Sequence, residues 1–310
     1  MTVDGQRIRC WRSAGHGSQD LADGVCNSCN CVFMSLALSL GTERFYDAIS
    51  AFGFGSKTNV DFFGESAGIV MQEGSVKTVD LARIGFGQAI AVTPLQLITA
   101  VCAAVNGGTL YEPYFLKEAH SADGTLVYSR EPKVVGNPIS SGTSEKLREL
   151  LVGVVENGGG TRAQVDGIQI GGKTGTAQKY ENGAVASGKY VSSFVGFAPA
   201  DDPQYAVLFI VDEPSGYTYY GSLTAAPYAG RIFSRIADGE GWLREETEEK
   251  TYISMPDVTG MEQADAVRTL EEAGLVVETA GDGRTVSTVP AAGESVAVGD
   301  VVLARCEDST

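Results

Sequence analysis

The 310-residue chain has few histidines and no long uninterrupted hydrophobic run. One of its two histidines, His120, lies in a predicted loop with no acid–base partner in view. The longest apolar stretch, residues 89–105, is interrupted by polar residues and a proline, which excludes a membrane-spanning helix there. The first seven residues contain no apolar run, so we expect no signal peptide in this chain.

Positive charge is also scarce. Against 39 acidic residues the chain has 23 Lys and Arg, and the net charge of −16 disfavours binding to nucleic acid. Residues 239–310 contain 16 acidic and 5 basic side chains, or −11, which leaves −5 for residues 1–238. This asymmetry predicts a first domain over residues 1–238, an acidic linker over 239–251 and a small second domain over 252–310.

The segment Lys173-Thr174-Gly175-Thr176 is compatible with two unrelated enzymes. Together with Gly167 and Gly172 it fits the phosphate-loop pattern G-x-x-x-x-G-K-[ST]. Residues 207–213 then look like a strand that ends in a magnesium-binding acid, as in a nucleotide hydrolase. As K-T-G, the same residues are one of three motifs of the penicillin-interacting serine enzymes.

The residues around Lys173 disfavour the phosphate loop. Such a loop needs a buried strand before its first glycine and a helix that starts at the lysine. Residues 161–166 are too polar for a central parallel strand, and residues 168–170 alternate like a half-buried strand. Turns at Asn182-Gly183 and at 199–203 separate further predicted strands, which indicates an antiparallel meander. A P-loop nucleotide hydrolase therefore remains only a remote alternative.

Capping patterns place several helices in the first domain. Thr93-Pro94 predicts a helix start and Asn106-Gly107 its end. A second helix is predicted to begin at Ser144, and further helices are predicted over 31–38 and 227–236. We therefore predict an α+β fold in which helices flank an antiparallel sheet.

The tripeptide Ser28-Cys29-Asn30 fits an S-x-N motif. With it, residues 1–238 resemble the transpeptidase domain of the class B penicillin-binding proteins. The resemblance also rests on the segments Phe86–Gln96, Asn106–Gly108, Gly171–Gln178 and Ser193–Pro199. It implies a serine β-lactamase-like fold and a D,D-transpeptidase that cross-links peptidoglycan stem peptides ending in D-Ala-D-Ala through an acyl-serine intermediate.

The resemblance also assigns roles to individual residues. Lys173 would present positive charge to the substrate carboxylate, and Ser28 would carry a proton to the leaving amine. Asn30 would bond an amide of the substrate, and the backbone amide of Thr176 would stabilise the oxyanion. Three further residues would bind substrate or line the cleft: Thr174, Gly175 and Gln178. Tyr217, Tyr219 and Tyr220 would form either an aromatic rim or a surface loop.

The nucleophile of this family lies in an S-x-x-K motif, some tens of residues before S-x-N. No serine of this chain is followed by a lysine three residues later. We therefore expect the chain to be the C-terminal part of a larger, N-terminally anchored protein that acts on the extracytoplasmic face of the membrane. By itself, the chain is expected to be inactive.

Cysteines gather near the S-x-N motif. Cys26, Cys29 and Cys31 are close in sequence, and Cys10 and His16 lie upstream. Zinc sites usually have two well-spaced ligand pairs, whereas this cluster offers a single CxxC. We therefore expect packed thiols, with neither a metal nor a cofactor.

The second domain has a pattern of its own. After an opening at Met255–Val258, residues 262–273 are predicted as a helix that ends at Gly274, and 275–277 and 298–303 as strands. This β-α-β-β order resembles a PASTA module, a type linked to peptidoglycan or β-lactam recognition. Its negative charge favours a structural role, because it repels anionic polymers.

Two classes of function remain open at this stage. The first is the catalytic part of a cell-wall transpeptidase, whose partners would be stem peptides, β-lactams and other cell-wall synthesis proteins. It would act in division, elongation or sporulation. The second is a non-catalytic module that binds muropeptides or β-lactams, or that mediates interactions.

Overall fold

The computed structural model describes residues 1–181, 184–216, 218–243 and 251–307. The chain divides into two compact units, Met1–Arg244 and Glu245–Thr310, which are described separately. The predicted Asn182-Gly183 turn, Tyr217 and the acidic run at 245–250 lie outside the described residues. Within the described ranges, no helix is long and apolar enough to cross a membrane.

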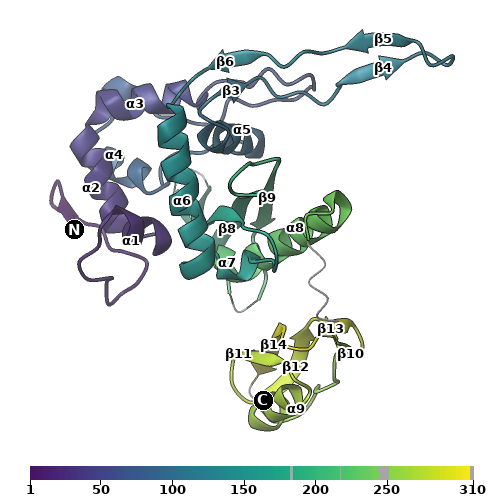
Figure 1. The fold of residues 1–310 in the computed structure, drawn as a ribbon. Coiled ribbons are helices and arrows are strands. Elements are labelled where there is room, and N and C mark those ends of the chain that lie inside the picture. The colour runs from purple at the N-terminus through teal and green to yellow at the C-terminus, as the bar shows by residue number, and fades with distance from the viewer. Residues whose placement is uncertain (182–183, 217, 244–250, 308–310) are drawn as a thin grey trace. The chain divides into compact units, whose positions relative to one another are not determined.

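The main sheet of the first unit has three antiparallel strands in the order β7-β8-β9 (Figure 1). These strands are β7 (Gly171–Glu181), β8 (Ala184–Ala198) and β9 (Tyr205–Asp212). Gly171 lies opposite Phe197 and Thr176 opposite Ser192 in the β7–β8 pair. The predicted meander is confirmed. Because Lys173 lies inside a strand and not at the start of a helix, the phosphate-loop alternative is wrong.

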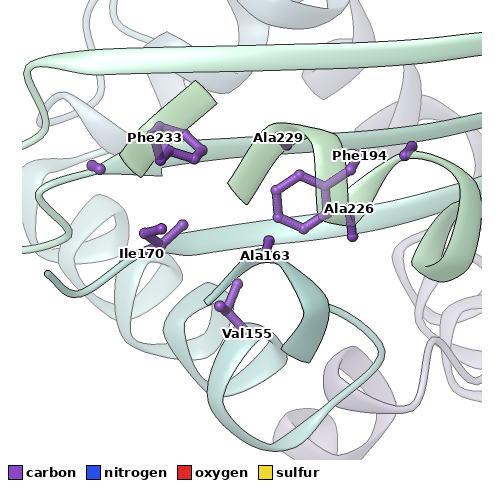
Figure 2. Close-up of a cluster of buried hydrophobic side chains, with 9 residues drawn as sticks. Val155, Ala163, Ile170, Phe194, Ala226, Ala229 and Phe233 are labelled. Carbon is purple, nitrogen blue, oxygen red and sulfur yellow. The ribbon is translucent and has the colours of Figure 1, made fainter. Parts of the chain in front are cut away.

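Two aromatic residues of β8 anchor helices to the sheet. Phe194 and Phe197 are fully buried and three residues apart, so they point to opposite faces of the strand. Phe194 packs with Phe233 of α8 (Ala226–Glu240), as Figure 2 shows. Phe197 packs with side chains of α5 (Pro94–Val105) and α6 (Ser141–Asn157). The predicted α+β architecture, with helices flanking an antiparallel sheet, is confirmed.

Small residues let α8 lie close to the sheet. Around Phe194 and Phe233, the buried cluster is completed by Val155, Ala163, Ile170, Ala198, Ala225, Ala226 and Ala229 (Figure 2). Beyond the end of α8, the backbone N–H of Trp242 donates to Ala237 O, and the Trp242 side chain packs against this cluster. Packed structure of the first unit therefore continues past residue 238.

Most helix ends lie close to where capping residues predicted them. Thr93 and Gln96 form a reciprocal capping box at the start of α5. The prediction that α6 begins at Ser144 is wrong, because Ser140 caps the helix through the backbone N–H of Thr143. Ser144 instead lies buried inside the helix, where its hydroxyl accepts from Gly107 N. Both serines can cap a helix, so local sequence did not distinguish them.

The remaining elements of the first unit are short. The helices are α1 (Leu21–Cys26), α2 (Asn30–Leu40), α3 (Thr42–Ala51), α4 (Thr78–Gly85) and α7 (Gly221–Thr224). The strands are β1 (Thr2–Val3), β2 (Gln6–Arg7), β3 (Leu110–Tyr111), β4 (Glu118–His120), β5 (Leu126–Ser129) and β6 (Val134–Gly136). In Figure 1 the β4–β5 hairpin extends away from the helices as an arm.

The second unit is a small α+β domain. Its strands are β10 (Tyr252–Ser254), β11 (Val276–Ala280), β12 (Arg284–Val289), β13 (Ser295–Ala297) and β14 (Val301–Glu307), and its helix is α9 (Gln263–Glu272). β14 pairs in parallel with β11 and antiparallel with β12. Met255, Val258, Leu270 and Val302 lie in its core.

The predicted β-α-β-β order of this domain was incomplete. The structure adds β12 and β13, which sequence analysis did not identify. In β12 the threonines Thr285 and Thr288 are buried, whereas Val286 and Val289 are exposed. This reverses the usual alternation of apolar residues toward the core, so the strand was not recognisable from its hydrophobic pattern.

Candidate active site

A cleft of about 1210 Å³ lies along β7 and the junction of α1 and α2 in the first unit. Its lining includes every residue that sequence analysis proposed for the site: Ser28, Asn30, Lys173, Thr174, Gly175, Thr176 and Gln178. Within the described residues β7 pairs only with β8, so its other edge has no strand partner. An unpaired strand edge can accept an extended peptide as an added strand.

The S-x-N and K-T-G motifs meet in this cleft. Lys173 Nζ donates to Ser28 Oγ at 2.9 Å and to the carbonyl oxygen of Thr174 at 3.1 Å. Ser28 and Lys173 are 145 residues apart in sequence. The contact therefore depends on the packing of α1 on α6 and of α6 on β7, and it places a hydroxyl and an amine within reach of one reacting group.

Ser28 lies in a tight turn between α1 and α2. Its φ of 50° lies in the left-handed region, which is uncommon for residues other than glycine. The turn is held by hydrogen bonds from Cys29 N to Gly24 O and from Gly159 N to Cys26 O. Non-glycine residues with such backbone angles occur frequently at functional sites, so the turn supports a role for Ser28.

Lys173 is half-buried in the cleft. Loss of solvation lowers the pKa of Lys173 from 10.5 to about 8, although nearby Cys26 has a smaller opposite effect. At pH 7 about a tenth of these side chains would be neutral. Lys173 can therefore both attract an anion and exchange a proton near neutral pH.

The threonines on either side of Gly175 have defined surroundings. The Thr176 hydroxyl oxygen accepts a hydrogen bond from Gly221 N at 3.0 Å, at the start of α7. Beside Thr174, a Cβ at Gly159 would lie only 3.4 Å from its hydroxyl oxygen. The loop that follows α6 therefore lies against the K-T-G strand and shapes this part of the cleft.

Two glycines lie where α7 approaches β7 and β8. A Cβ at Gly175 would lie 2.5 Å from Ser193 Oγ, and a Cβ at Gly221 would lie 2.3 Å from the Gly175 carbonyl oxygen. Both distances are shorter than any real contact. The close approach of α7 to the backbone of β7 and β8 is thus a structural reason for Gly221, whereas a Cβ at Gly175 would meet the end of the Ser193 side chain. For Gly175, access to the strand edge stays the reason that the sequence suggested.

Asn30 and Gln178 also line the cleft, at different places. Asn30 is the first residue of α2, and its Nδ2 donates to Arg9 O at 3.4 Å. Gln178 is exposed on β7, opposite Tyr190 in the register. Both positions agree with cleft-lining roles, whereas the part each side chain takes in catalysis stays a prediction.

The cleft has a cationic character that was not predicted from the sequence. Besides Lys173, the lining contains Arg9 and Arg83, and no acidic residue of the described chain lines it. This contrasts with the net charge of −16 for the whole chain. Neither arginine lies in a recognisable motif, so only the fold reveals that they share the cleft with Lys173. The cleft is therefore suited to anionic ligands.

An aromatic wall borders the same cleft. Tyr190 and Tyr219 stack with ring centroids 3.8 Å apart, and Tyr219 lies 4.7 Å from Tyr220. Trp11 packs edge-on against Tyr220 at 6.2 Å. Tyr219 and Tyr220 form the rim that was one of two alternatives for these tyrosines, while Trp11 and Tyr190 were not predicted.

Comparisons with known proteins agree with this architecture. The penicillin binding protein transpeptidase domain family matches residues 2–236, and the PASTA domain family matches residues 253–303. Stage V sporulation protein D of Bacillus subtilis is 41% identical over 310 residues, covering 97% of this chain and 48% of that protein. The probable peptidoglycan D,D-transpeptidase PenA of Neisseria gonorrhoeae is 34% identical, covering 68% of this chain and 34% of that protein.

Solved structures of similar fold include penicillin-binding proteins. The apo form of penicillin binding protein 3 from Mycobacterium tuberculosis superposes with a TM-score of 0.70 at 28% identity, covering 76% of this chain and 55% of that one. Its ampicillin complex matches with a TM-score of 0.66 at 28% identity, covering 74% and 53%.

The fold, the meeting of S-x-N with K-T-G and these matches define a penicillin-interacting transpeptidase domain. The chain belongs to the class B penicillin-binding protein family, as its sequence predicted, and also contains a PASTA domain. It spans between a third and a half of the length of the two curated relatives above.

Proposed function

We propose that this chain forms the substrate-binding side of a peptidoglycan D,D-transpeptidase active site. The observation that carries the proposal is the 2.9 Å hydrogen bond between Lys173 Nζ and Ser28 Oγ, which joins the K-T-G and S-x-N motifs in one cleft. None of the 310 residues belongs to an S-x-x-K motif, so the acyl-accepting serine has to come from a segment outside this sequence.

The charge of the cleft supports a substrate with a free carboxylate. A stem peptide that ends in D-Ala-D-Ala carries one, and so do the β-lactams. Lys173, Arg9 and Arg83 line the cleft without an acidic neighbour in the described lining. Thr174 would donate its hydroxyl hydrogen to this carboxylate while the peptide backbone lies along the free edge of β7.

Ser28 and Lys173 can then serve two proton transfers. When the nucleophilic serine attacks the D-Ala carbonyl carbon, the tetrahedral oxyanion would accept a hydrogen bond from the Thr176 amide. Collapse breaks the peptide bond, and the leaving D-Ala amine takes up the proton that the attacking serine hydroxyl has lost, carried through Ser28 and Lys173. In the second half, the acceptor amine attacks the acyl-serine and releases its proton by the same route. A lysine with a pKa near 8 suits both directions.

Three further parts of the proposal rest on the family. The complete protein would act on the extracytoplasmic face of the membrane. Its partners would be donor and acceptor stem peptides and other cell-wall synthesis proteins. The PASTA domain would have a structural role, in agreement with the charge of −11 on residues 239–310.

A chimera tests the proposal. This chain would be joined behind the S-x-x-K segment of a family member and exposed to a fluorescent penicillin. We expect one covalent adduct per molecule, located on the S-x-x-K serine by peptide mass spectrometry. The 310-residue chain without that segment should stay unlabelled, because the residues it supplies can bind but cannot form the acyl bond.

Two results would refute this assignment. One is a stoichiometric penicillin adduct on any residue of the 310-residue chain alone. The other is a folded chimera, verified by circular dichroism, that binds penicillin or muropeptide reversibly but never forms an adduct. The latter result would favour the non-catalytic binding module that the sequence left open.

A further inference from the structure

Three side chains that can ligate a metal lie together beside the S-x-N turn. Cys10 Sγ is 3.4 Å from His16 Nδ1 and 3.9 Å from Cys29 Sγ, and the three atoms all lie within 4.8 Å of one another. Cys29 is the middle residue of Ser28-Cys29-Asn30. The group therefore adjoins the candidate active site, yet the transpeptidase reaction has no use for it.

Two of the three separations match those of a tetrahedral zinc site, and the third, between His16 Nδ1 and Cys29 Sγ, is within 4.8 Å. Bonds of about 2.3 Å to sulfur and 2.0 Å to nitrogen place two sulfur ligands about 3.8 Å apart and a sulfur and a nitrogen about 3.5 Å apart. The observed separations are 3.9 Å and 3.4 Å. We propose that Cys10, His16 and Cys29 bind Zn²⁺ as a Cys₂His site, with the fourth position left to water or an added ligand.

A metal site here departs from the expectation drawn from the sequence. Cys26, Cys29 and Cys31, with Cys10 and His16 upstream, offer only one CxxC, and for that reason packed thiols without a metal were expected. In the structure Cys26 lines the cleft, and Cys31 packs against the core of α2 and α4. Chain folding instead brings Cys10 and His16 to Cys29, so the ligands come from two separate segments.

The chemistry of the group favours zinc over harder cations. Thiolate and imidazole are ligands for Zn²⁺, whereas Mg²⁺ and Ca²⁺ prefer oxygen ligands. On binding, each thiol would lose one proton to solvent, and neutral His16 would use the Nδ1 lone pair while keeping its proton on Nε2. Two thiolates then balance the charge of the ion, and no atom changes oxidation state.

Surrounding contacts hold the ligand loop in place before any metal binds. Trp11 packs on the His16 ring at 5.3 Å, and its Nε1 donates to Asn27 O at 3.0 Å. Asn30 Nδ2 donates to Arg9 O. The segment that carries Cys10 is thus connected to residues on both sides of Ser28. Cys29 is buried, whereas Cys10 and His16 are half-buried, which leaves a path for the ion.

Zinc at this position would act on the geometry of the candidate active site. The ion would join residues 10–16 to the turn that holds Ser28, and so restrict the motion of Ser28 relative to Lys173. We expect slower hydrogen–deuterium exchange at residues 27–33 and altered Trp11 fluorescence when zinc is added. Both readouts are independent of catalysis, so failure of the zinc proposal would leave the transpeptidase proposal intact.

Metal content of the full 310-residue chain is the decisive measurement. After purification in the presence of zinc and desalting, we expect inductively coupled plasma mass spectrometry to find about one zinc ion per chain. Cys29→Ala and His16→Ala should retain less than about a tenth of that amount. Cys31→Ala and Cys102→Ala are the matched controls, because neither thiol belongs to the group, and they should retain zinc as the parent chain does.

Cobalt substitution provides a test that does not depend on variants. The unmodified chain titrated with Co²⁺ should show the intense visible bands and the thiolate charge-transfer band of a tetrahedral thiolate site, and Zn²⁺ should displace them. This spectrum decides the matter if a ligand variant fails to fold. His16→Cys, which keeps three ligands, should restore zinc binding that His16→Ala loses.

Several outcomes would overturn the proposal. One is that the chain retains no zinc and gives the spectrum of octahedral Co²⁺. Another is that Cys31→Ala loses as much zinc as Cys29→Ala. A third is a disulfide between Cys10 and Cys29 that persists after the chain has been reduced and reloaded with zinc. Thiol titration would then find only four free thiols among the six cysteines.

Discussion

The two ends of strand β7 each carry a lysine, and the surroundings of the two ammonium groups differ. Lys179 Nζ lies 2.9 Å from Asp212 Oδ1 and 2.7 Å from Glu213 Oε1. These carboxylates raise the pKa of Lys179 above its usual value. Lys173 instead donates to the neutral Ser28 hydroxyl and forms no ion pair with any described residue. Loss of solvation lowers its pKa to about 8.

The two ammonium groups therefore differ in whether the protein itself supplies a counter-ion: Lys179 has carboxylate partners, and Lys173 has none among the described residues. A cation that is partly removed from water without a counter-ion destabilises the fold, so its presence needs another explanation. A ligand that brings its own negative charge would supply the missing partner. Lys179 is already neutralised by its neighbours, and a ligand carboxylate would gain little from it. We therefore propose that a ligand carboxylate binds at the Lys173 end of the strand.

The largest expected effect is on acylation in the chimera that carries an S-x-x-K segment. Lys173→Ala should reduce the rate of acylation by penicillin about a thousandfold or more, because it removes both the carboxylate partner and the proton carrier. Lys179→Ala should leave the rate within about twofold. Stopped-flow or gel-based labelling measures both. Equal losses in the two variants would remove the distinction between the two ends of β7.

A smaller loss is expected next to Lys173. Thr174→Val keeps the shape of the side chain but removes the hydroxyl donor to the substrate carboxylate. A hydrogen bond to a charged group contributes about 1.5–3 kcal/mol, so acylation should slow roughly ten- to a hundredfold. Thr125→Val is the matched control and should have no effect, because Thr125 lies in the β4–β5 hairpin and does not line the cleft. An unchanged rate in Thr174→Val would show that the carboxylate binds elsewhere.

The pH dependence of stability should also distinguish the two lysines. The pKa of Lys173 is lower in the folded chain than its ordinary 10.5, so the unfolded chain binds more protons between pH 8 and 10.5. The charged Lys173 destabilises the folded chain by its full amount below pH 8, and this destabilisation disappears as the pH rises to 10.5. A shift of this size corresponds to on the order of 3 kcal/mol.

Replacement of Lys173 by a neutral side chain checks this sign. In urea unfolding, Lys173→Met should be more stable than the parent chain at pH 7, and the difference should shrink by pH 10. An NMR titration of the lysine side chains should show one group that titrates near pH 8. A stability difference that stays constant with pH would mean that Lys173 is not desolvated.

The smallest effect is expected at the other end of the strand. Lys179→Met removes exposed ion pairs with Asp212 and Glu213, which contribute little in water. The urea midpoint should fall slightly at low salt, and the difference from the parent chain should vanish at high salt because of screening. A loss larger than the change in Lys173→Met would contradict the view that only the Lys173 charge is energetically exceptional.

Much of the fold was predictable because its signals are local. The capping box of Thr93 and Gln96 set the start of α5, and alternation with short turns indicated the β7–β9 meander. Prediction was less successful where local signals were ambiguous or reversed. Ser140 and Ser144 are equally good caps, and β12 buries threonines while exposing valines.

For the candidate site, the motifs and their order could be identified from the amino-acid sequence alone. S-x-N and K-T-G are short patterns whose chemistry is carried by a few adjacent residues, so Ser28, Asn30 and Lys173 were recognisable without a structure. The PASTA pattern was likewise recognisable from its own helix and strands.

Which residues from distant parts of the sequence lie together became clear only from the folded chain. It brought Lys173 to Ser28 across 145 residues, gathered Arg9 and Arg83 into the same cleft, and placed Cys10 and His16 beside Cys29. It also set the pKa of Lys173, because desolvation depends on every group packed around the ammonium and not on its neighbours in sequence. Such contacts result from the combined packing of many side chains, which no local pattern encodes.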